Sequence, residues 1–311
     1  KLQIEAEKKG TPIFKYIKEN FVLNKGFNLL PEPTPNDLFF DIEGVQDYVY
    51  PGKLEYLFGI FYEENGSKIF KPFWAHNKED EKKSVEDFFK FTKNHFKKYP
   101  KAKIYHYAPY EITALERLTS LHKVNNVDYD HFLNLSKFVD LYKIVKQAIY
   151  VSQKSYSIKD IEKFYDFKRE GDILKGDVSE EFYIQWTQTK DQKILDKIEE
   201  YNKQDCLSTF KLRRWLLRIK PKETKWFVSE KQEMELRPFE ETLLEYQDKI
   251  RNSKIKNTNL GKLLADIIGF YNREQKPQWR QHFDRKDLSD NDLIDDTECI
   301  ADMKQASCFQ D

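Results

Sequence analysis

Two acidic residues, Asp41 and Glu43, interrupt a short apolar run in the segment DLFFDIEG, residues 37–44. This run predicts a buried β-strand, and because side chains alternate along a strand, both carboxylates are expected on the same face. Burying two unpaired carboxylates would be costly in free energy. A divalent cation offsets that cost best, and oxygen-only ligands favour magnesium or manganese. The alternative is an edge or surface position, where both acids are simply solvated.

Two more acids lie at positions where chemistry is possible. Glu111 follows residues 106–110, where a strand is predicted to end and a helix to begin. The helix dipole alone would also explain an acid in this first turn. Asp205 comes four residues after Tyr201 in a predicted long helix, so both side chains share one helix face. The tyrosine hydroxyl could orient an attacking water there, although an ordinary amphipathic helix shows the same spacing.

The elements that would position these residues are strands followed by alternating helices and strands. The Asn65-Gly66 pair between the second and third strands is a strong hairpin signal. Asp140 and Ser157 are expected to cap the helices that follow them. The order predicts an α/β fold with a mixed five-stranded sheet flanked by helices and a mainly helical C-terminal extension. Strands are expected at residues 37–44, 54–63, 68–75, 103–107 and 138–141, and helices at 84–99, 109–121, 157–167, 179–187 and 191–219.

The charge pattern limits how the chain could bind nucleic acid. The 53 basic and 53 acidic residues cancel, which argues against a basic field over the whole chain but not against a local groove. Residues 211–225 hold seven basic residues and one acid, directly after the predicted site helix residue Asp205. Arg213, Arg214 and Arg218 are therefore expected to contact phosphates. The alternative is a solvated helix end whose charges complement the dipole.

Cysteine content and hydropathy suggest where the protein works. The three cysteines form no CxxC pair, which favours a reducing compartment, so a cytoplasmic location is expected. No apolar run approaches the roughly 18 residues that a membrane span needs, so no membrane partner is expected. The proline-rich residues 31–35 predict a domain boundary.

Taken in order, the three acidic motifs resemble those of the DnaQ-like, DEDDy exonuclease superfamily. In its second motif, that superfamily has Asn and Asp where this chain has His106 and Glu111. A closer resemblance, over about residues 28–219, is to the YprB-type ribonuclease-H-like domain of RecB-like nuclease–helicase proteins. It rests on the segments LPEPTPNDLFFDIEG, HYAPYE, SIKDIEKFYDF and IEEYNKQDCLSTFKLRRWL. Residues 260–285 resemble the connector that precedes the helicase in those proteins.

The resemblance implies a ribonuclease-H-like fold with 3′-to-5′ exonuclease activity on DNA, or else on RNA. Two magnesium or manganese ions, roughly 3.5–4 Å apart, would be held by Asp41, Glu43, Glu111 and Asp205. Tyr201 would then orient the attacking water, and Lys159 would contact a phosphate.

The implied partners are nucleic acid and a helicase domain or protein. The expected domains are a lead-in at residues 1–35, the exonuclease domain at 36–221 and a helical connector at 222–311. One alternative is a non-catalytic module of the same fold that binds nucleic acid and feeds it to a helicase. A spacer that only joins two enzymes is a third reading, but a spacer has no use for four acids in this order.

Overall fold

The computed structural model describes most of the N-terminal two thirds of the chain and a smaller part of the remainder. The chain divides into two compact units, Lys1–Gln232 and Glu233–Asp311. In the second unit, Thr258 caps helix α10 (Asn259–Ile267) by accepting a hydrogen bond from the Gly261 amide. Among the described residues, no helix is long and apolar enough to cross a membrane. The described residues are 1–18, 25–46, 52–134, 136–165, 167–169, 176–228, 242, 245–246, 249–250, 252–255, 258–268 and 285.

Five strands form one mixed sheet in the first unit. They are β2 (Leu38–Gln46), β3 (Lys53–Glu64), β4 (Ser67–Trp74), β5 (Ile104–His106) and β6 (Phe138–Asp140). Their order in the sheet is β4-β3-β2-β5-β6. Strand β3 pairs antiparallel with β2 and β4, whereas β5 runs parallel to β2 and β6. The predicted five-stranded mixed sheet is therefore confirmed.

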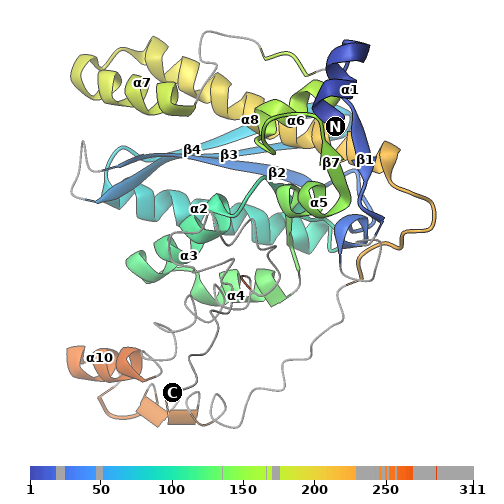
Figure 1. Cartoon of the computed structure of the whole chain (residues 1–311). Helices are drawn as coiled ribbons and strands as arrows, with labels where there is room; N and C mark the ends of the chain where they lie inside the picture. Colours follow the sequence, from blue (N-terminus) through green and yellow to red (C-terminus); the bar gives the residue numbers. More distant parts are fainter. Residues whose placement is uncertain are drawn as a thin grey trace, which may run out of the picture. The chain divides into compact units, whose positions relative to one another are not determined.

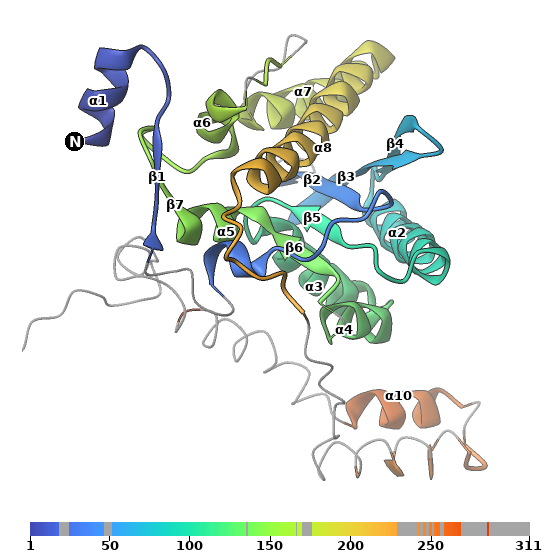
Figure 2. The ribbon, with the colours of Figure 1, turned by 90° about the vertical axis from the view of Figure 1, so that its right-hand side faces the viewer.

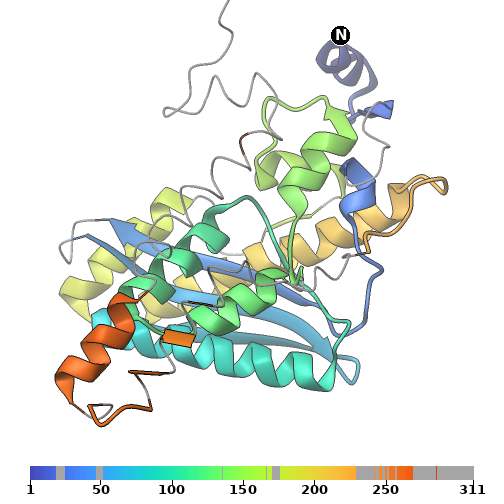
Figure 3. The ribbon, with the colours of Figure 1, turned by 90° about the horizontal axis from the view of Figure 1, so that it is seen from below.

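Helices cover both faces of this sheet. They are α2 (Lys78–Lys98), α3 (Tyr110–His122), α4 (Asn126–Asn134), α5 (Leu141–Ala148), α6 (Ile158–Ile161), α7 (Gly176–Thr189) and α8 (Gln192–Ile219). Figure 1 shows α7 and α8 on one face, and α2 and α3 on the other. Figure 3, seen from that second side, shows α2 running along this face of the sheet.

Alternating side chains of β2 belong to two separate apolar layers. The Phe40 ring packs 4.7 Å from that of Phe88 in α2, and the Phe39 ring packs 5.1 Å from that of Phe210 in α8. Asp41 and Glu43 have the parity of Phe39, so they face α8. The expectation that both acids share one face follows from this pleat, and the face is the one that α8 covers.

Local signals explain where several elements begin. Helix α2 starts at Lys78, earlier than predicted, because the Asn77 side chain accepts a hydrogen bond from the Asp80 amide. The caps predicted at Asp140 and Ser157 are confirmed, since both side chains accept hydrogen bonds from backbone amides of the following helix.

Other elements differ from the prediction or were not anticipated. The helix expected at 157–167 is only α6 followed by the 3-10 turn η3 (Glu162–Phe164). Helix α4 was not predicted, and α5 was expected only through the cap at Asp140, without an end point. The hairpin at Asn65 and Gly66 is confirmed, and both residues have positive φ angles, 52° and 79°.

Residues before the sheet also pack on it. Strand β1 (Phe14–Tyr16) pairs antiparallel with β7 (Ile149–Val151). The 3-10 turn η2 (Gly26–Leu29) contributes buried Phe27 to the apolar cluster that contains Phe39. The domain boundaries expected at residues 35 and 221 remain predictions.

Candidate metal centre

Three carboxylates from two elements meet on the face of the sheet that α8 covers. Asp41 and Glu43 come from β2, Asp205 comes from α8, and one oxygen of each lies within 4.8 Å of the other two. The two strand acids are partly buried, and Asp205 is buried. Figure 2 shows α8 crossing above β2, which brings these distant parts of the chain together.

The closeness of these acids changes their protonation. Burial, together with the charge of Asp205, raises the pKa of Glu43 from its ordinary 4.5 to about 8. Burial and the charges of Asp205, Glu43 and Glu111 raise the pKa of Asp41 well above its ordinary value. Without a cation this cluster therefore favours bound protons, which a divalent ion would displace on binding.

Glu111 lies outside the group of three acids. It is buried in the first turn of α3, and one of its oxygens, Oε2, lies 3.5 Å from Nδ1 of His106. That imidazole nitrogen lies nearer to the carbonyl oxygen of Ala108, at 2.8 Å, and donates to it. Within the described part of the chain, Oε2 of Glu111 accepts no hydrogen bond. Burial raises the pKa of Glu111, although His106 opposes the shift.

A comparison with protein families identifies the domain that carries these acids. The family model RNase_H_2, described as RNase_H superfamily, matches residues 38–217, which is more than half of the chain. The chain belongs to the RNase H superfamily. No curated protein matches it significantly, and no solved structure does either. The matched range includes the five-stranded sheet and nearly all of α8, and so every acid described above.

Tyr201 and Lys159 lie together beside the acids of the RNase H domain. The Lys159 ammonium donates a hydrogen bond to the Tyr201 hydroxyl at 3.3 Å. Burial and the charge of Asp205 raise the pKa of Tyr201, so the phenol stays protonated. Burial and the neighbouring charge of Arg169 lower the pKa of Lys159.

The RNase H domain also holds a cation that the sequence analysis missed. The Arg169 side chain is 7% exposed, and its Nη2 donates to Asp205 Oδ1 at 2.5 Å and to Glu162 Oε1 at 2.6 Å. Its Nε donates to both Glu162 oxygens at 3.1 Å. Arg169 lies in an irregular segment and meets Asp205 only in the tertiary structure, so no local pattern pointed to it.

Asn202 supports Asp41 from α8. Its Nδ2 donates to Asp41 Oδ2 at 2.7 Å. The residue opposite Asp41 in β3 is Gly59, and a Cβ there would lie 1.7 Å from Oδ1 of Asn202. A glycine inside a predicted strand is a signal of such close approach, and Asn202 is the neighbour of Tyr201 in the third motif.

The three arginines expected to contact phosphates have different environments. Arg213 is buried, pairs with the Asp37 carboxylate and lies over the Phe39 ring. It is therefore not positioned to contact a phosphate, and its role is to hold α8 against the sheet. Arg214 and Arg218 are exposed, as expected.

The donor set fits a hard divalent cation. Three carboxylates crowd together, and burial and mutual repulsion raise the pKa values of Asp41 and Glu43. The buried Oε2 of Glu111 lacks a hydrogen-bond donor among the described residues. Magnesium and manganese prefer such all-oxygen sites. The residues that would hold the ion are Asp41, Glu43 and Asp205, and Glu111, with its oxygen unpartnered among the described residues, offers a fourth carboxylate.

Proposed function

We propose that this RNase H superfamily domain is a metal-dependent nuclease that hydrolyses phosphodiester bonds of DNA, or else of RNA, from the 3′ end. The observation that carries the proposal is the meeting of Asp41, Glu43 and Asp205 within 4.8 Å in a domain of this superfamily. A cluster of partly buried acids costs free energy unless cations compensate it. Metal ions held by such a cluster are what hydrolysis of a phosphodiester requires.

Two magnesium or manganese ions would be held by Asp41, Glu43, Asp205 and Glu111. When bound, such ions supply Lewis-acid stabilisation of the phosphoryl group and lower the pKa of water. The side chains around them fix the ligands: Asn202 orients Asp41 and Arg169 orients Asp205 through the hydrogen bonds described above.

Tyr201 and Lys159 would act on the water and the substrate. The Tyr201 phenol is protonated, so it can donate a hydrogen bond and orient an attacking water. Lys159 holds that hydroxyl at 3.3 Å and places a positive charge where a phosphate would approach. Both side chains would thus position reactants around the acids.

The 3′-to-5′ direction and the helicase partner rest on the sequence resemblance. The likeness to YprB-type domains covers residues 28–219, and that of residues 260–285 to a helicase connector suggests a larger nuclease–helicase protein. The division at residues 35 and 221 belongs to the same proposal.

The decisive experiment is digestion of single strands labelled at the 5′ or the 3′ end, with manganese and with a chelator. The proposal expects manganese-dependent shortening from the 3′ end, lost in Asp41→Asn and Asp205→Asn, which keep side-chain size. Glu86→Gln, an exposed acid on α2, is the matched control and should cleave like the wild type. Strand binding without any manganese-dependent cleavage would instead support the non-catalytic module.

A further inference from the structure

A pocket on α8 lies outside the acid cluster. It is lined by Tyr165, Lys211, Arg214, Leu217 and Arg218, which we call the basic pocket, and has a volume of about 290 Å³. We infer that the basic pocket binds backbone phosphates of the nucleic-acid strand, a few nucleotides from the bond being cleaved. This inference rests on the proposed function, and it assigns the strand a path along α8.

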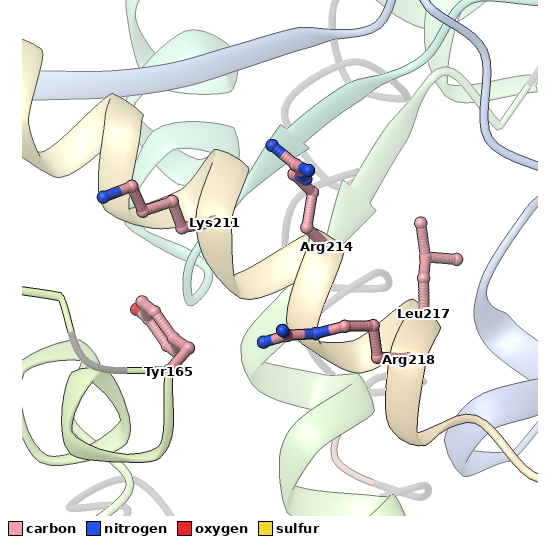
Figure 4. A pocket seen from close by; sticks show the side chains of 5 residues that line it. All are labelled: Tyr165, Lys211, Arg214, Leu217 and Arg218. Atoms are coloured by element: carbon pink, nitrogen blue, oxygen red, sulfur yellow. The ribbon is translucent and has the colours of Figure 1, made fainter.

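The three cations of the pocket lie on one face of the helix. Lys211, Arg214 and Arg218 have the spacing i, i+3, i+7, which aligns side chains in an α-helix. Figure 4 shows Lys211 and Arg218 extending to the side on which Tyr165 lies, with Arg214 projecting from the turn between them. In the part of the chain that the structure describes, none of the three pairs with an acidic side chain. A bound anion would relieve their mutual repulsion.

An aromatic wall accompanies these charges. The Tyr165 ring is held 6.2 Å from that of Trp215, and the Lys211 ammonium lies 4.8 Å from the Phe167 ring. Positive side chains beside a fixed aromatic ring are the combination that binds single strands, through phosphate contacts and base stacking. The volume is just below the roughly 300–1,000 Å³ of small-molecule sites, so the pocket suits part of a strand rather than a separate cofactor.

The basic pocket and the acids have a fixed separation. Asp205 and four of the five pocket residues lie on α8, whose rise of about 1.5 Å per residue puts Lys211 about 9 Å and Arg218 about 20 Å along the axis from Asp205. At the roughly 3.4 Å per nucleotide of a B-form strand, this equals about three to six nucleotides. A dinucleotide at the acids would therefore not reach the pocket.

Hydrogen bonds tie the pocket wall to the acid cluster. The Tyr165 hydroxyl donates to Ser208 at 2.8 Å, and Ser208 donates to Glu162 at 2.7 Å. Glu162 in turn pairs with Arg169, which binds Asp205. This series of hydrogen bonds and ion pairs fixes the position of the pocket wall relative to the acids, so that a single strand can contact both.

The test compares two triple variants. Lys211→Ala/Arg214→Ala/Arg218→Ala removes the pocket charges. Lys83→Ala/Lys90→Ala/Lys97→Ala removes the same charge from an exposed face of α2, on the other side of the sheet. Strand affinity is measured in chelator by fluorescence anisotropy across a salt series. Hydrolysis with manganese is measured on a dinucleotide and on a strand long enough to span the pocket.

The pocket variant should bind the long strand at least tenfold more weakly. The magnitude of its slope of log affinity against log salt should fall by about two, because each of the three lost side chains would contact one phosphate and each contact contributes roughly 0.7. Its kcat/KM ratio, long strand over dinucleotide, should also fall at least tenfold. The α2 variant should change neither quantity. Glutamine at the same three positions provides a second pocket variant if the alanine variant does not fold.

Equal affinities and slopes for the two variants would overturn the inference, because the effect on binding would then depend on total charge and not on the basic pocket. Displacement of the strand by polyglutamate at equal charge concentration would also overturn it, in favour of an acidic protein partner. If the wild type shows no manganese-dependent hydrolysis, the proposed function fails, while the binding measurements in chelator still decide whether the pocket holds a strand.

Discussion

Arg169 donates a hydrogen bond to Asp205 at 2.5 Å and pairs with Glu162 through the same guanidinium. One fixed positive charge is thus shared by two buried carboxylates, and one of these belongs to the group of three acids. The charge lowers the electrostatic cost of the metal-free site, and it also opposes a cation that binds to Asp205.

Replacing Arg169 with Gln should separate these two effects. The metal-free variant should lose about 3–5 kcal/mol of stability, because a buried pair loses one partner. Manganese should then raise its unfolding temperature by more than it raises that of the wild type, since a cation can take over the lost charge. Thermal unfolding in chelator and in manganese measures both quantities. Lys203→Gln, which removes an exposed pair with Glu200, is the control. A smaller manganese effect in the Arg169 variant would contradict this role.

The stability of the metal-free protein should depend on pH through Glu43. Its folded pKa of about 8 exceeds the ordinary 4.5, so the folded state binds more protons than the unfolded state between these values. The contribution of Glu43 to the free energy of unfolding is therefore fully present below about pH 4.5 and is lost as the pH rises through about 8. Urea unfolding in chelator should show this decline, and Glu43→Gln should reduce it, whereas Glu86→Gln should not. Stability that rises over this range would show that the acids are ionised and compensated.

Asn202→Ala should weaken manganese binding by roughly 10–100-fold, because Asp41 loses the donor that orients it. Gly59→Ala should have a similar effect, since its Cβ would displace the Asn202 amide. In the double variant the amide is gone, so the two losses should not add. The Phe70 ring, 2.9 Å from that Cβ, must still shift. Titration calorimetry measures the affinities, and fully additive losses would argue that the glycine acts elsewhere.

Tyr201→Phe should lower turnover by at least about tenfold while leaving manganese affinity unchanged, because only the hydroxyl is lost. Single-turnover rates and calorimetry separate the two quantities. Tyr150→Phe, at an exposed tyrosine, is the control for removal of a phenol. A wild-type rate for Tyr201→Phe would exclude an orienting role for this hydroxyl.

Arg213 and Arg214 are neighbours with opposite expected phenotypes. Arg213→Ala should cost about 3–5 kcal/mol, because it leaves the buried Asp37 carboxylate unpaired. It should leave the salt dependence of strand binding unchanged. Arg214→Ala should hardly affect stability and should reduce the salt slope by about 0.7. Chemical unfolding and a salt series on both variants check this, and a reversed pattern would mean that α8 is rotated relative to the sheet.

The sequence predicted the features that depend on local periodicity. The shared face of Asp41 and Glu43 follows from the strand pleat, and the shared face of Tyr201 and Asp205 from the helical repeat. The order of the motifs also predicted that these two pairs belong to one site, and the close approach of Asp41, Glu43 and Asp205 agrees with it.

What the sequence did not predict depends on contacts between distant segments. Arg169 and Asn202 have ordinary local contexts, and only the packing of α8 on the sheet gives them partners in the site. Burial of Arg213 depends on Asp37, a residue 176 positions away. A run of basic residues indicates total charge, but it does not indicate which side chains point inward.

Two segments that flank the RNase H domain pair with each other, and this pairing determines which residues must be kept when the domain is transferred to another protein. The Phe227 amide donates to the Leu30 carbonyl at 2.8 Å, and Pro31 and Phe227 form a β-bridge. A transplanted segment limited to residues 36–221 would lack this pairing and the fully buried Phe27 and Leu30, and would therefore expose the apolar cluster around Phe39 that these two side chains cover. A transferred domain should therefore extend from β1 through Phe227, and linkers should be attached outside these limits.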